Sequence, residues 1–157
     1  MFTILLATDG SSYALNATRY AAKLVGLMKG DVEITVLYVK DISLPLIGFV
    51  GEPGGEILPD SSVMQDQVDH AAETALAATV KCFEGFGIKA TPVSAWGKPA
   101  DTICSTASKG NFDLVVMGSS GAGQITGILL GSVSDRVIHC ARVPVLIVRP
   151  QPEKEKK

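Results

Sequence analysis

Short apolar runs alternate along the chain with longer stretches in which apolar residues recur every three or four positions. A run of about four to eight apolar residues between turn-forming residues is typical of a buried strand, and the longer spacing is typical of an amphipathic helix. The runs that predict strands are Thr3–Thr8, Val32–Val39, Ile88–Ala95, Asp113–Met117 and Val143–Val148, and the third of these alternates apolar with polar residues. Pro92 lies in the third run and predicts an edge strand, because proline cannot donate to the ladder of a central strand.

The helical spacing fills most of the intervals between these runs. The predicted helices are Ser11–Gly30, Ser61–Gly87, Pro99–Gly110 and Ser132–Ala141. Ser11 or Ser12 can cap the first helix, and Gly30 is expected to end it. Ser132, with Asp135 three residues later, matches a variant of the capping box at the start of the last helix.

This alternation of strands and helices predicts an α/β fold. Parallel strands need crossover helices, and right-handed crossovers give a single doubly wound, Rossmann-like five-stranded parallel sheet in the order 3-2-1-4-5, with helices on both faces. Residues 1–150 are expected to form this one domain, and residues 151–157 a charged, flexible tail. The aperiodic stretch from Lys40 to Asp60, rich in glycine and proline, predicts a mobile lid.

Composition narrows the classes of function. The formal net charge of the 157 residues is -2, which gives no basic footprint for nucleic acid or for an acidic membrane. No apolar run reaches the roughly 18 residues of a membrane span, and Met1 leads directly into a strand-like run where a secretory signal would carry basic residues and an apolar core. These features predict a cytoplasmic protein without membrane or nucleic-acid partners.

The cysteines and histidines suggest no catalytic or metal site. Cys82, Cys104 and Cys140 are odd in number, lie far apart and fall at apolar phases of helical patterns, so they are expected to be buried free thiols. His70 and His139 have no partners at ligand spacing, and we predict neither a metal centre nor catalytic residues.

The segment MGSSGAGQITGILLGS, from Met117 to Ser132, carries the clearest chemical signal. It follows an apolar strand, is rich in glycine and leads into a helix, an arrangement that brings backbone N–H groups close to an anion such as phosphate. It lacks the Gly-Lys-Ser/Thr ending of a P-loop, and its glycines follow the fourth strand, whereas those of the Rossmann fingerprint follow the first.

The spacing G-2x-G-9x-G(S/T) at Gly118, Gly121 and Gly131-Ser132 resembles the signature of nucleotide-binding members of the universal stress protein family. The resemblance extends to LLATDGS after the first strand, to LLGSVSDRVI and to PVLIVRP near the end, and so covers nearly the whole chain. It implies a pocket for ATP or AMP. It also implies a homodimer formed through the last strand, Val143–Val148, whose apolar edge no later helix covers.

The resemblance implies a role for each matching residue. Asp9 would accept hydrogen bonds from the ribose hydroxyls, and Val39 would present its backbone to adenine. Glycine-loop amides would hold the phosphates. The implied site residues are Thr8, Asp9, Gly10, Val39, Met117, Gly118, Gly121, Gly131, Ser132 and Val133.

The chain departs from many family members in the loop. Ser119, Ser120 and Thr126 stand where basic residues are common, which leaves the choice between ATP, AMP and another adenine ligand open. A divalent cation such as Mg²⁺ is one way to supply the missing charge. The predicted function is an adenine-nucleotide-binding regulator or sensor of stress; the alternatives are a slow metal-assisted ATP hydrolase and a nucleotide-free dimeric interaction module.

Overall fold

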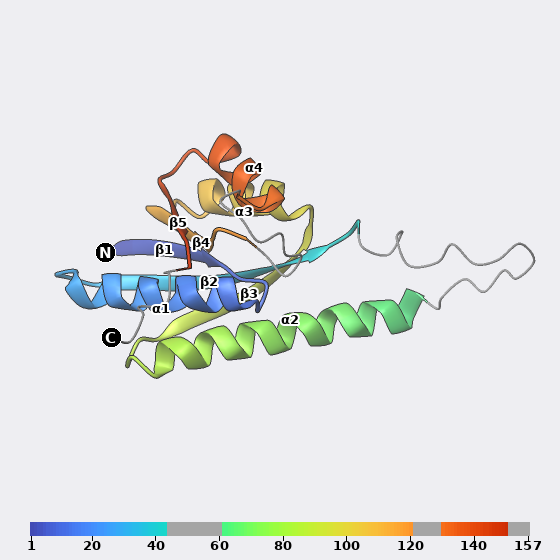
Figure 1. The fold of residues 1–157 in the computed structure, drawn as a ribbon, viewed down its shortest axis with the longest axis horizontal. Helices are drawn as coiled ribbons and strands as arrows, with labels where there is room; N and C mark the ends of the chain where they lie inside the picture. The colour runs from blue at the N-terminus through green and yellow to red at the C-terminus, as the bar shows by residue number, and fades with distance from the viewer. Residues whose placement is uncertain (44–60, 121–129, 151–157) are drawn as a thin grey trace, which may run out of the picture.

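The structure, a computed structural model, describes residues 1–43, 61–120 and 130–150 (Figure 1). The strands are β1 (Phe2–Ala7), β2 (Val32–Asp41), β3 (Ala90–Gly97), β4 (Leu114–Gly118) and β5 (Val145–Val148). The helices are α1 (Ser12–Leu27), α2 (Ser61–Glu84), α3 (Pro99–Lys109) and α4 (Ser132–Cys140). β2 includes Lys40 and Asp41, which the sequence assigned to the lid. Of the rest of that proposed lid, Ile42 and Ser43 form a turn after β2, and 44–60 lies outside the described residues, as does the predicted tail, 151–157.

The strands form one five-stranded parallel sheet in the order β3-β2-β1-β4-β5. The predicted doubly wound sheet is therefore confirmed. β3 is an edge strand, as Pro92 predicts, and β5 lies at the opposite edge. Because all strands are parallel, their carboxyl ends meet at one side of the sheet, and the order reverses between β1 and β4.

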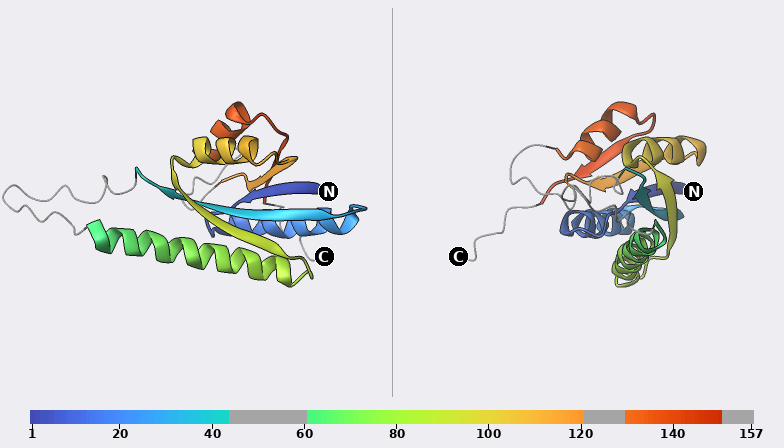
Figure 2. Two further views of the ribbon diagram at one scale, coloured as in Figure 1. Left: turned by 180° about the vertical axis from the view of Figure 1, so that it is seen from behind. Right: turned by 90° about the vertical axis from the view of Figure 1, so that its right-hand side faces the viewer.

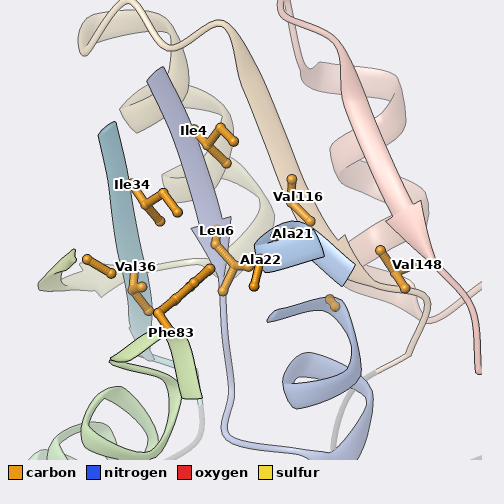
Figure 3. Close-up of a cluster of buried hydrophobic side chains, with 11 residues drawn as sticks. Ile4, Leu6, Ala21, Ala22, Ile34, Val36, Phe83, Val116 and Val148 are labelled. Atoms are coloured by element: carbon orange, nitrogen blue, oxygen red, sulfur yellow. The ribbon is translucent and has the colours of Figure 1, made fainter. Parts of the chain in front are cut away.

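Helices cover both faces of the sheet, as Figure 2 shows in its end-on view. Ile4 and Leu6 of β1 pack against α1 and α2, together with Phe83, which is 0% exposed (Figure 3). Leu5, from the same strand, packs on the opposite face with residues of α3 and α4, among them Ile103. Both faces of the central strand are thus buried, which accounts for its unbroken apolar run.

The two ends of α1 test the predicted cap at Ser11 and the predicted end at Gly30. Ser11 caps α1 by accepting a hydrogen bond from the N–H of Ala14 at 3.2 Å, as predicted. The prediction that Gly30 ends this helix is wrong: α1 ends at Leu27, because Met28 is already extended, and Gly30 adopts φ +112° in the turn that follows. In the described part of the chain, no helix is both long and apolar enough to cross a membrane.

The prediction of free thiols is wrong for two of the cysteines. Cys104 and Cys140 form a disulfide that joins α3 to the end of α4, with their Cα atoms 6.1 Å apart. Cys82 is a half-buried free thiol. The spacing of 36 residues between the bonded cysteines did not indicate a pair, because only the packing of α3 beside α4 on one face brings them together.

Candidate functional site

The sequence-predicted site residues gather mainly at the carboxyl ends of β1, β2 and β4 and at the start of α4. Ala7 lies opposite Leu37 in the sheet, and Leu6 lies opposite Val116. Two residues further along in the same registers, Asp9 lies level with Val39 of β2, and Thr8 lies level with Gly118 of β4. The fold therefore brings together segments that are far apart in the sequence.

Thr8 and Gly10 form a turn that packs against α2. The Thr8 side chain is buried, and its Oγ1 lies 3.0 Å from Oγ1 of Thr79. The N–H of Gly10 donates to Thr8 Oγ1 at 3.2 Å. Gly10 has φ +76°, and a Cβ atom there would lie 2.8 Å from Cβ of Ala75. This packing alone requires a glycine at position 10.

Asp9 is exposed at the end of β1 and begins the turn into α1. Its Oδ1 accepts a hydrogen bond from the N–H of Ser11 at 2.9 Å. Burial raises the pKa of the Tyr38 hydroxyl, and the negative charge of Asp9 raises this pKa further. The carboxylate thus acts electrostatically on a side chain of β2.

Tyr38 is a residue that the sequence reasoning missed. The signal available was its position directly before Val39, near the end of the second apolar run. Alternation along β2 sends its side chain to the α1–α2 face, because Ile34 and Val36 lie on that face. The Val39 side chain takes the other face, where it packs beside the cluster that contains Leu37.

The backbone of Val39 points toward the site. The carbonyl oxygen of Leu37 accepts a hydrogen bond from the N–H of Thr8 at 3.0 Å. In a parallel strand, backbone groups two residues apart face the same neighbour, so those of Val39 also face the β1 side. β1 ends at Ala7, and the Val39 groups are directed at the space beyond it.

The first loop glycine has a packing role. A Cβ atom on Gly118 would lie 2.9 Å from the backbone carbon and oxygen of Tyr13, in the first turn of α1. Glycine is therefore required here for the close approach of α1 to β4. Met117, directly before it, is 7% exposed and belongs to the core on the α3–α4 face.

The described ends of the glycine loop are held together by backbone hydrogen bonds. The N–H of Gly131 donates to the carbonyl of Ser119 at 2.8 Å, and the N–H of Ser119 donates to Val148 of β5 at 3.0 Å. The buried hydroxyl of Ser134 donates to the same Ser119 carbonyl at 2.9 Å. These bonds fix the start of α4 beside the end of β4. Gly121 lies outside the described residues.

The predicted cap at Ser132 is wrong. Gly131 is the N-cap of α4 and Ser132 is the first helical residue, while the N–H of Asp135 donates to the carbonyl of Gly131 at 2.9 Å. Since glycine has no side chain, no side-chain cap occupies this helix start. The Ser132 side chain is exposed, and Val133 is half-buried against the α3–α4 core. The first amides of α4 suit an anion.

A charged and aromatic cluster lies at the end of β2. Nζ of Lys40 lies 2.6 Å from Oδ1 of Asp69, which joins β2 to α2. The same ammonium lies 5.1 Å from the ring centroid of Trp96, its neighbour on β3. Among residues 1–43, 61–120 and 130–150, no three His, Cys, Asp or Glu side chains gather as a metal site would require.

Comparison with known proteins agrees with this fold. Residues 1–149 match the universal stress protein family. The chain belongs to this family. The universal stress protein MJ0531 of Methanocaldococcus jannaschii is 36% identical over 97% of this chain and 84% of its own.

Solved structures of universal stress proteins and related proteins share the fold. MJ0577, whose biochemical function was assigned from its structure, superposes with a TM-score of 0.74 at 25% identity, covering 97% of this chain and 98% of its own. A universal stress protein solved in complex with cAMP gives 0.66 at 23% identity, covering 94% and 96%. An Arabidopsis thaliana member with AMP bound gives 0.66 at 17% identity, covering 98% and 94%.

Proposed function

We propose that this universal stress protein binds an adenine nucleotide beyond the carboxyl ends of β1, β2 and β4 and acts as a regulator or sensor of stress. The observation that carries the proposal is the bond from Gly131 to Ser119, which sets the first amides of α4 beside the end of β4. That helix start, next to the point where strand order reverses, is where an α/β fold binds phosphate.

The phosphates would lie on the amides of Ser132 and Val133, with Gly131 allowing close approach. Because Gly131 already serves as the N-cap, the Ser132 hydroxyl is not needed for capping and is exposed. Gly118 would contribute by letting α1 pack close to β4, and Met117 by holding the end of β4 in the core. Gly121 completes the motif as a prediction.

Asp9 and Val39 would select the nucleoside. A carboxylate can accept several hydrogen bonds, so Asp9 can bind ribose hydroxyls while its Oδ1 accepts the Ser11 N–H. The inward-facing backbone of Val39 offers one donor and one acceptor to the adenine edge. Thr8 and Gly10 would support Asp9 through their turn against α2. The universal stress proteins solved with cAMP and AMP make an adenine ligand the natural choice.

The charge of the glycine loop decides how many phosphates the proposed site favours. Ser119 and Ser120 supply no positive charge to the loop, so a triphosphate gains less here than in family members with basic residues. Mg²⁺ would bind together with the nucleotide, because an Mg²⁺ ion that is held by phosphate oxygens needs only one or two protein ligands. We therefore expect AMP to bind about as tightly as ATP in the absence of Mg²⁺.

Calorimetric titration with ATP, ADP, AMP and cAMP tests the proposal. Asp9→Asn keeps an oxygen for the Ser11 N–H and removes the charge, so it should weaken nucleotide binding about tenfold without loss of fold. Asp31→Asn makes the same charge change in the turn before β2, at the amino end of the sheet, and should bind like the wild type. Absence of binding for all four nucleotides would contradict the proposal.

The dimer and the location are further predictions. β5 is an edge strand, which pairing with a second copy through Val143–Val148 requires. Light scattering of Leu146→Lys tests this, since an unchanged dimer would exclude pairing through that edge. A cytoplasmic location is tested by cell fractionation; the Cys104–Cys140 disulfide counts against it, because disulfides are rare in reducing compartments.

A further inference from the structure

A groove of about 450 Å³ lies between α1 and the edge strand β5, and none of the described residues that line it is a predicted residue of the nucleotide site. Its α1 wall is formed by Asn16, Arg19, Tyr20 and Lys23. The spacing of these residues places them on one face of the helix. The opposite wall is formed by the segment Leu146–Pro150, and Phe86, after α2, also lines the groove.

The dimensions of the groove suit an extended peptide. Along α1, Asn16 to Lys23 spans about 10 Å at the rise of an α-helix. Along β5 and the two residues that follow it, Leu146 to Pro150 spans about 13 Å at the rise of a strand. The two walls are joined where the Asn16 amide donates to the carbonyl of Arg149 at 3.3 Å. A segment of about four extended residues matches this length.

The charged side chains that are described in the groove lining are all positive. Arg19, Lys23 and Arg149 line the groove and are exposed, and no carboxylate is found among the described residues that line it. The protein as a whole carries a formal net charge of -2, so this positive group stands against the overall balance. The ion pairs found among the described residues, Lys40–Asp69 and Arg136–Asp101, involve other cations.

The groove also presents apolar surface. Tyr20 is 44% exposed and Phe86 is 48% exposed, although both are large aromatic side chains. Leu146 of β5 is half-buried between the core and the groove. Aromatic residues and arginine are enriched where proteins bind other proteins, because they combine apolar area with polar contacts.

We propose that this groove binds an extended acidic segment of a partner protein. Carboxylates of that segment would pair with Arg19, Lys23 and Arg149, while an apolar side chain would pack on the exposed rings. The dimer proposed above would pair a second copy with the free edge of β5, not with this groove. A second copy is a poorer occupant of the groove itself, because a two-fold contact between identical grooves would place cations against cations. The proposal does not depend on nucleotide binding.

Fluorescence anisotropy on the full-length protein tests the proposal. The probe is a fluorescein-labelled octapeptide of six glutamates around a central Leu-Phe pair, and the comparison peptide has six lysines around the same pair. The glutamate peptide should bind more tightly than the lysine peptide, and its affinity should fall as salt rises because the groove charges are exposed. Failure of the glutamate peptide to bind at low salt would overturn the proposal.

A matched pair of double variants locates the binding site. Arg19→Glu with Lys23→Glu should weaken binding of the glutamate peptide at least about tenfold. Arg142→Glu with Lys89→Glu makes the same change in charge at exposed positions outside the groove and should bind as the wild type does. Equal losses in both double variants would overturn the proposal, since the peptide would then sense only net charge.

Light scattering on the same variants separates the partner from a second copy. If the protein has the same mass in the wild type and in the groove variant, loss of peptide binding supports a partner segment. If the groove variant changes the mass while peptide affinity is unchanged, the occupant is a second copy and the proposal is overturned.

Discussion

The α1–α2 face and the α3–α4 face of the sheet are stabilised in different ways. On the first face, helices of 16 and 24 residues bury alanines of α1 and the ring of Phe83 against the strands. On the second, helices of 11 and 9 residues add the Cys104–Cys140 disulfide and the Arg136–Asp101 ion pair to their apolar contacts.

The difference concerns the candidate nucleotide site directly. α4, whose first amides are proposed to hold phosphate, is the shortest of the four described helices. Helices this short gain little from their own backbone hydrogen bonds and depend on tertiary contacts. We therefore expect the links from α4 to α3 to stabilise the proposed phosphate end of the site, and the α1–α2 face to carry more of the stability of the whole fold.

The largest expected effect is on the α1–α2 face. Phe83→Ala removes a fully buried ring and should lower the free energy of unfolding by about 3–5 kcal/mol. Phe86→Ala, at a ring that is 48% exposed, should cost less than about 1 kcal/mol. Urea denaturation followed by circular dichroism measures both. Equal losses would show that burial of the Phe83 ring is not what stabilises the α1–α2 face.

The next effect concerns the disulfide. Replacing Cys104 and Cys140 together by serine should destabilise the oxidised protein by about 2–4 kcal/mol, because the unfolded chain regains freedom. Hydrogen exchange should rise in α4 more than in α2. Cys82→Ser, at a free thiol on α2, is the control and should leave exchange in α4 unchanged. Unchanged exchange in α4 of the double variant would contradict a stabilising link.

A pair of glycine substitutions compares the site with the last turn of α1. Gly118→Ala brings a Cβ atom to 2.9 Å from the Tyr13 backbone and should cost about 1–3 kcal/mol. Gly26→Ala, within α1, meets nothing within 4 Å and should gain up to about 1 kcal/mol. Thermal melts measure both changes. A neutral Gly118→Ala variant would remove the packing explanation for this loop glycine.

The smallest effect lies at the amino end of the sheet, between the two faces. Asp113 Oδ2 accepts hydrogen bonds from Thr3 N at 2.8 Å and Thr3 Oγ1 at 2.9 Å, and these bonds lower the pKa of the carboxyl. The stabilisation that the Asp113 carboxylate contributes is therefore fully present above the usual aspartate pKa, about 3.9. It is lost as the pH falls through the lowered pKa of Asp113 in the folded protein.

Asp113→Asn should be slightly less stable than the wild type at pH 7, and the difference should shrink below about pH 4. Asp66→Asn changes an exposed carboxylate of α2 and serves as the control. Urea midpoints measured across the acid range would contradict this linkage if the difference between Asp113→Asn and wild type stayed constant.

The strands and their order could be predicted from sequence because the apolar runs of β1 and β4 are buried on both faces, Pro92 marks β3 as an edge strand, and crossovers have one hand. Details that depend on which helices meet could not. The Cys104–Cys140 bond needs α3 beside α4, and the requirement for Gly118 comes from Tyr13, which is more than 100 residues away in the chain. The cap at Ser132 failed for a local reason, because Gly131 can take the extended conformation and begin the helix itself.

The contact between Lys40 and Trp96 gives the protein a built-in optical reporter. Trp96 is the chain's single tryptophan, and it is 44% exposed with the Lys40 ammonium over its ring. Lys40 directly follows Val39, whose backbone faces the proposed adenine position. Any ligand that shifts the end of β2 moves a cation over this indole, so the emission of one residue follows binding without an attached label.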